Sequence, residues 1–165
     1  MGINVTKWRT AVAPTMSISG TTFYTGLFRH SLDDKNRVTI PSLWRSTHAD
    51  GDVFLATCHP SGYIAVLPPA EVDKLREKVS QVPLSDTAGQ DFLARFFSTT
   101  QAVSFDSQGR MMFNADLLRH AGIGKEVVLT GTMNKFFVYS PERWVQATAR
   151  TEGESQLDVM RRVGI

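Results

Sequence analysis

Two short stretches of this sequence share one layout, and together they decide the fold that we predict. The first, "LDDKNRVTIP", runs from Leu32 to Pro41, and the second, "FDSQGRMMFN", runs from Phe105 to Asn114. In each stretch an aspartate stands four residues before an arginine, and the arginine opens a short apolar run that is typical of a strand. The repetition indicates that the chain consists of two related halves.

The spacing within each copy is that of a tight turn between two strands. Asn36 and Gly109 stand directly before the two arginines, and these residue types tolerate a positive φ angle best. Asp33 and Asp106 are placed where a side-chain oxygen can accept hydrogen bonds from the N–H groups of the turn. We therefore expect each copy to form a turn with one left-handed residue, after which the arginine begins the returning strand.

The similarity between the halves continues beyond the turns. In each half we expect a strand, the turn, a second strand, a short helix, two further strands and a longer helix. The first set is expected at residues 23–32, 37–40, 42–49, 52–57, 62–67 and 68–82, and the second at 99–106, 110–113, 114–122, 126–131, 135–140 and 141–150. Between them, Ser85 or Asp86 can cap a connecting helix.

This pattern predicts an α+β fold built from two duplicated, β-rich halves. Its expected parts are a flexible N-terminal arm over residues 1–22, a first half over 23–82, a connecting helix over 83–98, a second half over 99–151 and a C-terminal tail over 152–165. Apolar residues recur about every third position in the tail, so it can form a short helix.

The composition is that of an ordinary globular protein, with 42% hydrophobic and 21% charged residues. The formal net charge of +2 is too small for a strongly basic nucleic-acid binder. The charge is unevenly placed, however. Residues 1–40 contain five basic and two acidic residues, which gives +3 and leaves −1 for residues 41–165. The excess positive charge therefore gathers around the first copy of the motif.

Several classes of site and location are disfavoured. With one cysteine, Cys58, the chain can form neither an internal disulfide nor a thiolate zinc cage, and we expect Cys58 to be a small buried apolar residue. No run approaches the roughly 18 apolar residues that span a bilayer, and the amino end lacks the apolar core of a signal peptide. We expect a cytoplasmic protein with no membrane partner.

Two interpretations of the motif arginines remain open. In the first, Arg37 pairs with Asp33 and Arg110 pairs with Asp106, and each pair holds its turn. An exposed pair of this kind contributes about 0–1 kcal/mol. In the second, the turns project the arginines toward DNA, because a guanidinium can donate two parallel hydrogen bonds to phosphate or to guanine. The roles are compatible, since an aspartate can hold an arginine in the pose that DNA requires.

The two copies differ in the charge that accompanies the arginine. The first turn offers Lys35 beside Arg37, with Arg29 shortly before it, so it can form a basic finger. In the second copy Gln108 stands where the first has Lys35. The structural role is therefore favoured for Arg110.

These residues carry a resemblance to a known family. "GLFRHSLDDKNRVTIPSLWR" (residues 26–45) resembles the first half of the MraZ family of bacterial transcriptional regulators. "AVSFDSQGRMMFNADLLRHAGI" (102–123) and "EVVLTGTMNKFFVYSPERW" (126–144) resemble its second half. The match covers residues 23 to about 150. It implies an AbrB/SpoVT-like DNA-binding fold whose two barrel-like halves are related by a pseudo-two-fold within one chain.

The resemblance also implies partners and site residues. Family members assemble into rings of many subunits and bind short direct repeats in promoter DNA upstream of the division and cell-wall gene cluster, usually as repressors. The expected partners are double-stranded DNA and further copies of this chain, with a nucleoid-associated location. By position, Arg37 and Lys35 are the first candidates for DNA contact, followed by Arg29 and Arg110. Asn36 departs from the usual Gly of the family pattern.

Two further departures lie in the second copy, where Asn114 replaces the usual Pro and Gln108 removes a positive charge. They put equal DNA contact by the two turns in doubt.

Assembly into a multi-subunit ring has a physical reason of its own. Each phosphate contact adds about 0.9 to the salt dependence of binding, so a module with three basic residues binds weakly at physiological salt. Several linked modules raise avidity by roughly 10²–10⁴.

Other function classes find less support. An enzyme is not expected, because the histidines have no metal-ligand spacing and "CHPSG" (residues 58–62) is more simply a turn than a Cys–His site. We expect no metal, no cofactor and no small-molecule substrate. The alternative is an antitoxin-like or protein-interaction module on the same fold, with no promoter function. The doubled motif and the long connecting helices favour the regulator.

Overall fold

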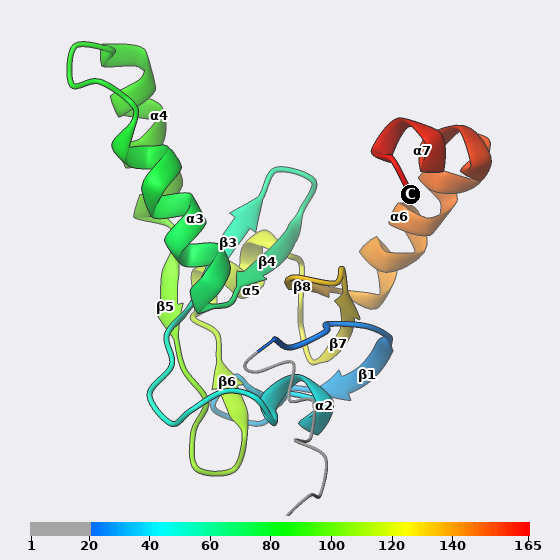
Figure 1. The fold of residues 1–165 in the computed structure, drawn as a ribbon. Helices are drawn as coiled ribbons and strands as arrows, with labels where there is room; N and C mark the ends of the chain where they lie inside the picture. The colour runs from blue at the N-terminus through cyan, green and yellow to red at the C-terminus, as the bar shows by residue number, and fades with distance from the viewer. Residues whose placement is uncertain (1–20) are drawn as a thin grey trace, which may run out of the picture.

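Eight strands and six helices follow one another in the computed structural model, which describes residues 21–165 (Figure 1). The first set is β1 (Leu27–Ser31), β2 (Arg37–Thr39), α2 (Ser42–Arg45), β3 (Phe54–His59), β4 (Tyr63–Leu67), α3 (Pro69–Ser80) and α4 (Thr87–Ser98). The second set is β5 (Gln101–Val103), β6 (Arg110–Met112), α5 (Ala115–His120), β7 (Glu126–Gly131), β8 (Phe136–Tyr139), α6 (Pro141–Glu152) and α7 (Gln156–Val163). Most of the expected N-terminal arm lies outside the described residues.

Strands from the two parts of the sequence are interleaved within one sheet. The six-stranded sheet has the order β1-β7-β8-β4-β3-β5, and every pairing in it is antiparallel. β2 and β6 form a separate two-stranded antiparallel ribbon. The first strand of each part therefore pairs with the hairpin of the other part: β1 pairs with β7 of the β7–β8 hairpin, and β5 pairs with β3 of the β3–β4 hairpin. The order is unchanged when each strand is exchanged for its counterpart and the sheet is read from the other edge.

The main core lies between the ribbon and one face of the sheet. Val38 of β2 and Met111 of β6 are fully buried there, beside inward-facing residues of β7 and β8. Trp44 of α2 fills the centre: it is fully buried, and its ring stacks on Phe136 with centroids 5.0 Å apart. Its indole N–H donates to the carbonyl oxygen of Thr25 at 3.1 Å, so the one polar atom of the side chain is satisfied.

A smaller cluster lies on the opposite face of the sheet. Because side chains alternate along a strand, Val128 and Tyr139 point away from the main core while their neighbours point into it. Tyr63 and Ala65 of β4 join them, and Trp144 of α6 packs against the cluster. This alternation places apolar side chains on both faces of the central strands.

Two helical pairs project from the sheet on opposite sides of the molecule, α3 with α4 and α6 with α7 (Figure 1). Asp86 caps α4 by accepting a hydrogen bond from the N–H of Gly89 at 2.9 Å, and Ser140 caps α6 by accepting one from Arg143 at 3.2 Å. None of the four helices contains a buried residue. Their apolar side chains are therefore only partly used within this chain.

Most of the expected elements are present, with local differences in length. The helix expected over 42–49 is confirmed only as far as Arg45, and its first turn has no side-chain cap. The side chain of Asn114 caps α5 by accepting from the N–H of Leu117 at 2.9 Å, as predicted. The C-terminal tail is helical as α7. Within residues 21–165, no helix is long and apolar enough to cross a membrane.

Candidate nucleic-acid interface

The first motif turn is organised by the carboxylate of Asp33. One oxygen accepts hydrogen bonds from the backbone N–H groups of Lys35 and Arg37, each at 2.9 Å. The other oxygen lies 2.7 Å from Nε of Arg37. Asn36 has a φ angle of +58°, and its N–H donates to the Asp33 carbonyl at 3.0 Å. The acid therefore holds both the backbone of the turn and the arginine that follows it.

The second turn repeats this arrangement at the same distances. Asp106 accepts from the N–H groups of Gln108 and Arg110 at 2.9 Å each, and its second oxygen lies 2.7 Å from Nε of Arg110. Gly109 takes the left-handed position with a φ angle of +74°. Two turns of unlike sequence have thus reached one geometry, because Asp, a left-handed residue and Arg occupy equivalent places in both.

The ribbon of β2 and β6 brings the two arginines to one surface. Val38 lies opposite Met111 in the pairing register, and both point into the core. Residues directly opposite each other in an antiparallel pair share a face, and the neighbours alternate with them. The outer face of the ribbon therefore carries Arg37, Thr39, Arg110 and Met112.

The two turns also hold each other. The N–H of Ile40 donates to the carbonyl of Gly109 at 3.1 Å, and the N–H of Phe113 donates to the carbonyl of Asn36 at 3.1 Å. In addition, the Nη1 atom of Arg110 lies 3.8 Å from the carboxylate of Asp33. Each left-handed residue is therefore fixed by a strand end from the other half, and the site is one unit.

The environment of the two acids favours their charged form. The pKa of Asp33 is lowered chiefly by the hydrogen bond from the N–H of Arg37, with further contributions from its guanidinium and from the N–H of Lys35. The pKa of Asp106 is lowered in the same way by Arg110. Hydrogen bonds to a carboxylate stabilise its anionic form. Each motif arginine therefore lies against an anionic carboxylate at neutral pH.

The pairing with aspartate leaves donor groups of the motif arginines available. Arg37 contacts Asp33 through Nε, and its terminal nitrogens donate to no protein group among residues 21–165. Its side chain is 28% exposed, against 23% for Arg110, whose terminal nitrogen also approaches Asp33. The first arginine therefore offers more donor capacity to an external ligand than the second.

A third arginine near the ribbon was not anticipated from the sequence. Nε of Arg45, in α2, donates to the carbonyl of Ile40 at 2.7 Å, and its guanidinium covers Gly109 so closely that a Cβ atom there would clash with it. Gly109 is buried as a result, whereas Asn36 is exposed. The position equivalent to Arg45 in α5 is Leu118, so the repeat gives no hint of this cation. The sequence offered only one related difference, Gly109 in the second copy against Asn36 in the first.

The other two predicted cations, Lys35 and Arg29, differ in how close they lie to the motif arginines. Lys35 is exposed at the tip of the first turn, beside Asp34. Arg29 is exposed on β1, where it lies opposite Val128 of β7. Val128 belongs to the cluster under α6, so Arg29 occupies the sheet face opposite the one that carries the ribbon. The fold thus places Lys35 with Arg37 but does not bring Arg29 to the same surface.

Comparison with known proteins identifies close relatives. A protein-family model described as "MraZ protein, putative antitoxin-like" matches residues 96–163. The chain is 36% identical over 123 residues to a transcriptional regulator MraZ of Clostridium acetobutylicum, which covers 74% of this chain and 85% of the relative. A protein of the same name from Clostridium tetani is 30% identical over 143 residues, covering 86% of this chain and 99% of the relative. A third, from Natranaerobius thermophilus, is 36% identical over 121 residues.

Proposed function

This chain belongs to the MraZ family, and from that premise we propose that it is a DNA-binding transcriptional regulator, not an enzyme, that contacts promoter DNA through the β2–β6 ribbon. The observation that carries the proposal is the pose of Arg37. Its Nε is held by Asp33 at 2.7 Å while its terminal nitrogens point to no acceptor within residues 21–165.

An arginine held in this way is suited to DNA. The aspartate orders the side chain before binding, so less rotamer entropy is lost on contact. The two terminal nitrogens can still donate to a phosphate or to the O6 and N7 atoms of guanine. A bare surface ion pair would explain the contact with Asp33 but not the repeated placement of both arginines on the outer face of one ribbon.

The five cations of the candidate site are not equivalent in this proposal. Arg37 and Lys35 make the principal contacts, because both are accessible at the first turn. Arg110 and Arg45 contribute mainly by positioning the second turn, since Nη1 of Arg110 also approaches Asp33 and the guanidinium of Arg45 covers Gly109. Arg29 reaches DNA only at the flank of the site, because it lies on the other sheet face.

The strand order supports a second part of the proposal, that the chain contains two AbrB/SpoVT-like halves related by a pseudo-two-fold. The sheet β1-β7-β8-β4-β3-β5 maps onto itself when the halves are exchanged, and the ribbon pairs the two motifs with each other. In this arrangement one chain reproduces what a dimer of single-motif chains would build. The ribbon then lies where the two halves meet.

We also propose that the chain acts as a multi-subunit ring on short direct repeats upstream of the division and cell-wall gene cluster, as a repressor. A formal charge of +2 per chain is small for a solitary DNA binder. Identical modules that engage repeated sites together gain avidity of about 10²–10⁴ without any new contact. This gain in avidity requires regularly spaced repeats in the DNA and a closed assembly of subunits that can contact them together.

A gel-shift titration on the DNA upstream of the gene tests this function. Arg37→Ala should lose about 1–3 kcal/mol of binding free energy per engaged subunit, because a forked arginine contact is removed. Arg37→Lys should recover only part of the loss, since lysine cannot donate two parallel bonds. Lys78→Ala, an exposed cation on α3, serves as the control and should bind normally.

Two results would redirect the assignment. If Arg37→Ala binds the upstream DNA as tightly as the unmodified protein, the ribbon is not the contact surface. If the unmodified protein shows no preference for its upstream DNA over an unrelated sequence but captures a specific protein, the interaction-module alternative applies. Circular dichroism on each variant ensures that lost binding is not lost folding.

A further inference from the structure

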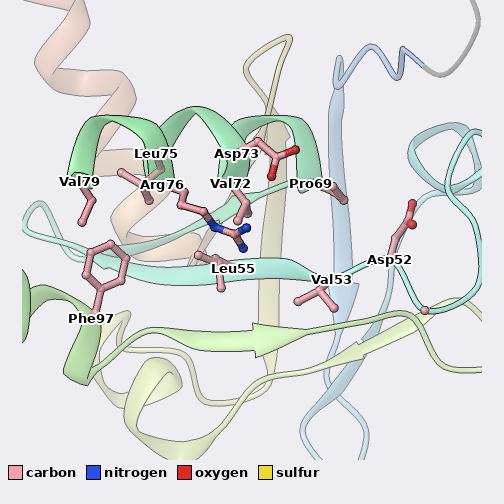
Figure 2. A pocket seen from close by; sticks show the side chains of 11 residues that line it. Asp52, Val53, Leu55, Pro69, Val72, Asp73, Leu75, Arg76, Val79 and Phe97 are labelled. Carbon is pink, nitrogen blue, oxygen red and sulfur yellow. The ribbon is translucent and has the colours of Figure 1, made fainter. Parts of the chain in front are cut away.

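An open apolar cleft lies between α3 and β3, on the side of the molecule away from α6 and α7 (Figure 2). Its volume is about 510 Å³. The floor and walls are mainly apolar, and Val53 at one end is 49% exposed. The apolar lining is Val53, Leu55, Val72, Leu75, Val79 and Phe97. Exposed apolar surface of this kind marks an interaction site more often than an ordinary surface does.

Two unpaired charges stand on the α3 wall of the cleft. Figure 2 shows the guanidinium of Arg76 reaching down toward Leu55, with Asp73 one turn nearer the start of the helix. Neither side chain forms an ion pair or a hydrogen bond within residues 21–165, although neighbouring Glu71 and Lys74 pair at 2.8 Å. Read along α3, the wall therefore presents an acid and then, three residues later, a base.

Helix α7 carries an unpartnered face with the same charge order. Leu157, Met160 and Val163 are 55%, 45% and 59% exposed, and they lie on one side of the helix at successive turns. Asp158 and Arg161 lie beside this stripe, so α7 also presents an acid followed by a base three residues on. Their mutual contact is long, 3.5 Å, and both side chains are about 70% exposed.

We propose that α7 of a second copy of this chain occupies the α3–β3 cleft, with the two helices antiparallel. Antiparallel packing sets Asp73 against Arg161 and Arg76 against Asp158, whereas parallel packing would set like charges together. The lengths agree. Val72 to Val79 spans about 10 Å of α3 and Leu157 to Val163 about 9 Å of α7, at 1.5 Å per residue.

The occupant is a second copy because the chain's own α7 lies at the end of α6, apart from α3 and the cleft (Figure 1). One surface of each subunit would thus contact a different surface of the next. Such head-to-tail contacts extend from copy to copy and close into a ring when the rotation permits. The inference rests on the proposed function, for which it supplies the subunit contact, and it leaves the β2–β6 ribbon uncovered.

A charge-exchange experiment tests the contact. The cleft variant carries Asp73→Arg with Arg76→Asp, and the helix variant carries Asp158→Arg with Arg161→Asp. Light scattering after size exclusion, at low ionic strength, should show each variant associating at least tenfold more weakly than the unmodified chain. A chain that carries both exchanges should recover its assembly, and so should an equimolar mixture of the two variants. The matched control exchanges Asp116 and Arg119, an exposed pair with the same spacing on α5.

The alternatives give different results. If a chain ending at Ser155 keeps the full assembled mass, or if the doubly exchanged chain does not recover, α7 is not the occupant. If deletion of residues 1–20 abolishes assembly while the α7 exchange has no effect, the N-terminal segment is the occupant. A monomeric unmodified chain would also overturn the inference. None of these measurements uses DNA, and Arg37→Ala leaves the cleft intact, so DNA contact by the ribbon and the α7 contact can each fail without the other.

Discussion

The backbone carbonyl of Asn36, in the first motif turn, accepts a hydrogen bond from the N–H of Phe113, at the end of the second motif, at 3.1 Å. The carbonyl of Gly109 accepts the reciprocal bond from Ile40 at the same distance. Neither turn is therefore an independent hairpin. The left-handed residue that each turn requires is also the point at which the other half attaches, so a change in one turn affects both.

Gly109→Ala should be more destabilising than Asn36→Ala. Both substitutions place an alanine in a left-handed conformation, which costs about 1–2 kcal/mol relative to glycine and somewhat less relative to asparagine. At Gly109 the new Cβ would also displace the Arg45 guanidinium from the Ile40 carbonyl. A charged hydrogen bond of this kind contributes about 1.5–3 kcal/mol. Urea unfolding should show a loss of about 2.5–5 kcal/mol at residue 109 and about 1 kcal/mol or less at residue 36.

The Arg45→Ala background isolates the second effect. If the close approach of Arg45 is the cause, the excess cost of Gly109→Ala should disappear in that background. Equal losses for the two alanine substitutions in the unmodified background would contradict the assignment.

The stability of the turns should depend on acid pH. The pKa values of Asp33 and Asp106 are lowered in the folded chain, mainly by hydrogen bonds from the N–H groups of Arg37 and Arg110. The stabilisation is thus complete above the ordinary aspartate pKa of about 3.9 and is lost as the pH falls through the lower folded values. Paired Asp33→Asn and Asp106→Asn substitutions should reduce the denaturation midpoint at pH 7 and flatten its fall below about pH 4.

The two single Asn variants provide the comparison for this prediction. Because the two carboxylates accept the same set of hydrogen bonds at the same distances, Asp33→Asn and Asp106→Asn should have similar effects. If the denaturation midpoint of the double variant falls below about pH 4 as steeply as that of the unmodified protein, the turns do not carry this pH dependence.

Gln108→Lys should increase DNA affinity. Gln108 occupies the exposed tip equivalent to Lys35, and the substitution restores the charge that the second turn lacks. One added phosphate contact steepens the dependence of log affinity on log salt by about 0.9 per engaged subunit. Gln146→Lys on α6 adds the same charge away from the ribbon. Equal salt slopes for the two variants, measured by fluorescence anisotropy, would place the second turn outside the DNA contact.

Trp44 should be far more important for stability than Trp144. Trp44 is fully buried, stacks on Phe136 and donates to Thr25, whereas Trp144 is only partly buried against the sheet. Trp44→Ala should cost about 3–5 kcal/mol of unfolding free energy. Trp144→Ala should cost clearly less, since its site remains open to solvent. Comparable losses in urea titrations would mean that α6 is held more tightly than its exposure indicates.

The local elements were predictable because short-range contacts create them. The Asp-x-x-x-Arg turns close through hydrogen bonds between residues two to four positions apart, and Asn114 caps α5 through the N–H three residues later. The short helix after β2 was predicted too long. Its first turn has no side-chain cap, and the residues beyond it are held by other contacts, such as the hydrogen bond between His48 and the hydroxyl of Tyr24.

The composition of the candidate surface was less predictable than its turns. Arg45 was missed because its role depends on lying over Gly109, 64 positions later in the chain. Arg29 was grouped with the motif because it is close in sequence, but the pairing of β1 with β7 turns its side chain to the opposite face. Spacing along the chain cannot show which face of a sheet a side chain occupies until the partner strand is known.

The sequence by itself determined the two turns, the residue types at their left-handed positions and the order of the helices and strands, because hydrogen bonds and propensities within a few residues decide these features. Only the tertiary structure decided that β2 pairs with β6, that each motif attaches to the left-handed residue of the other, and that Arg37 and Arg110 share one surface while Arg29 does not. Those outcomes depend on burying Val38 and Met111 together, which is a contact between distant residues that no local pattern encodes.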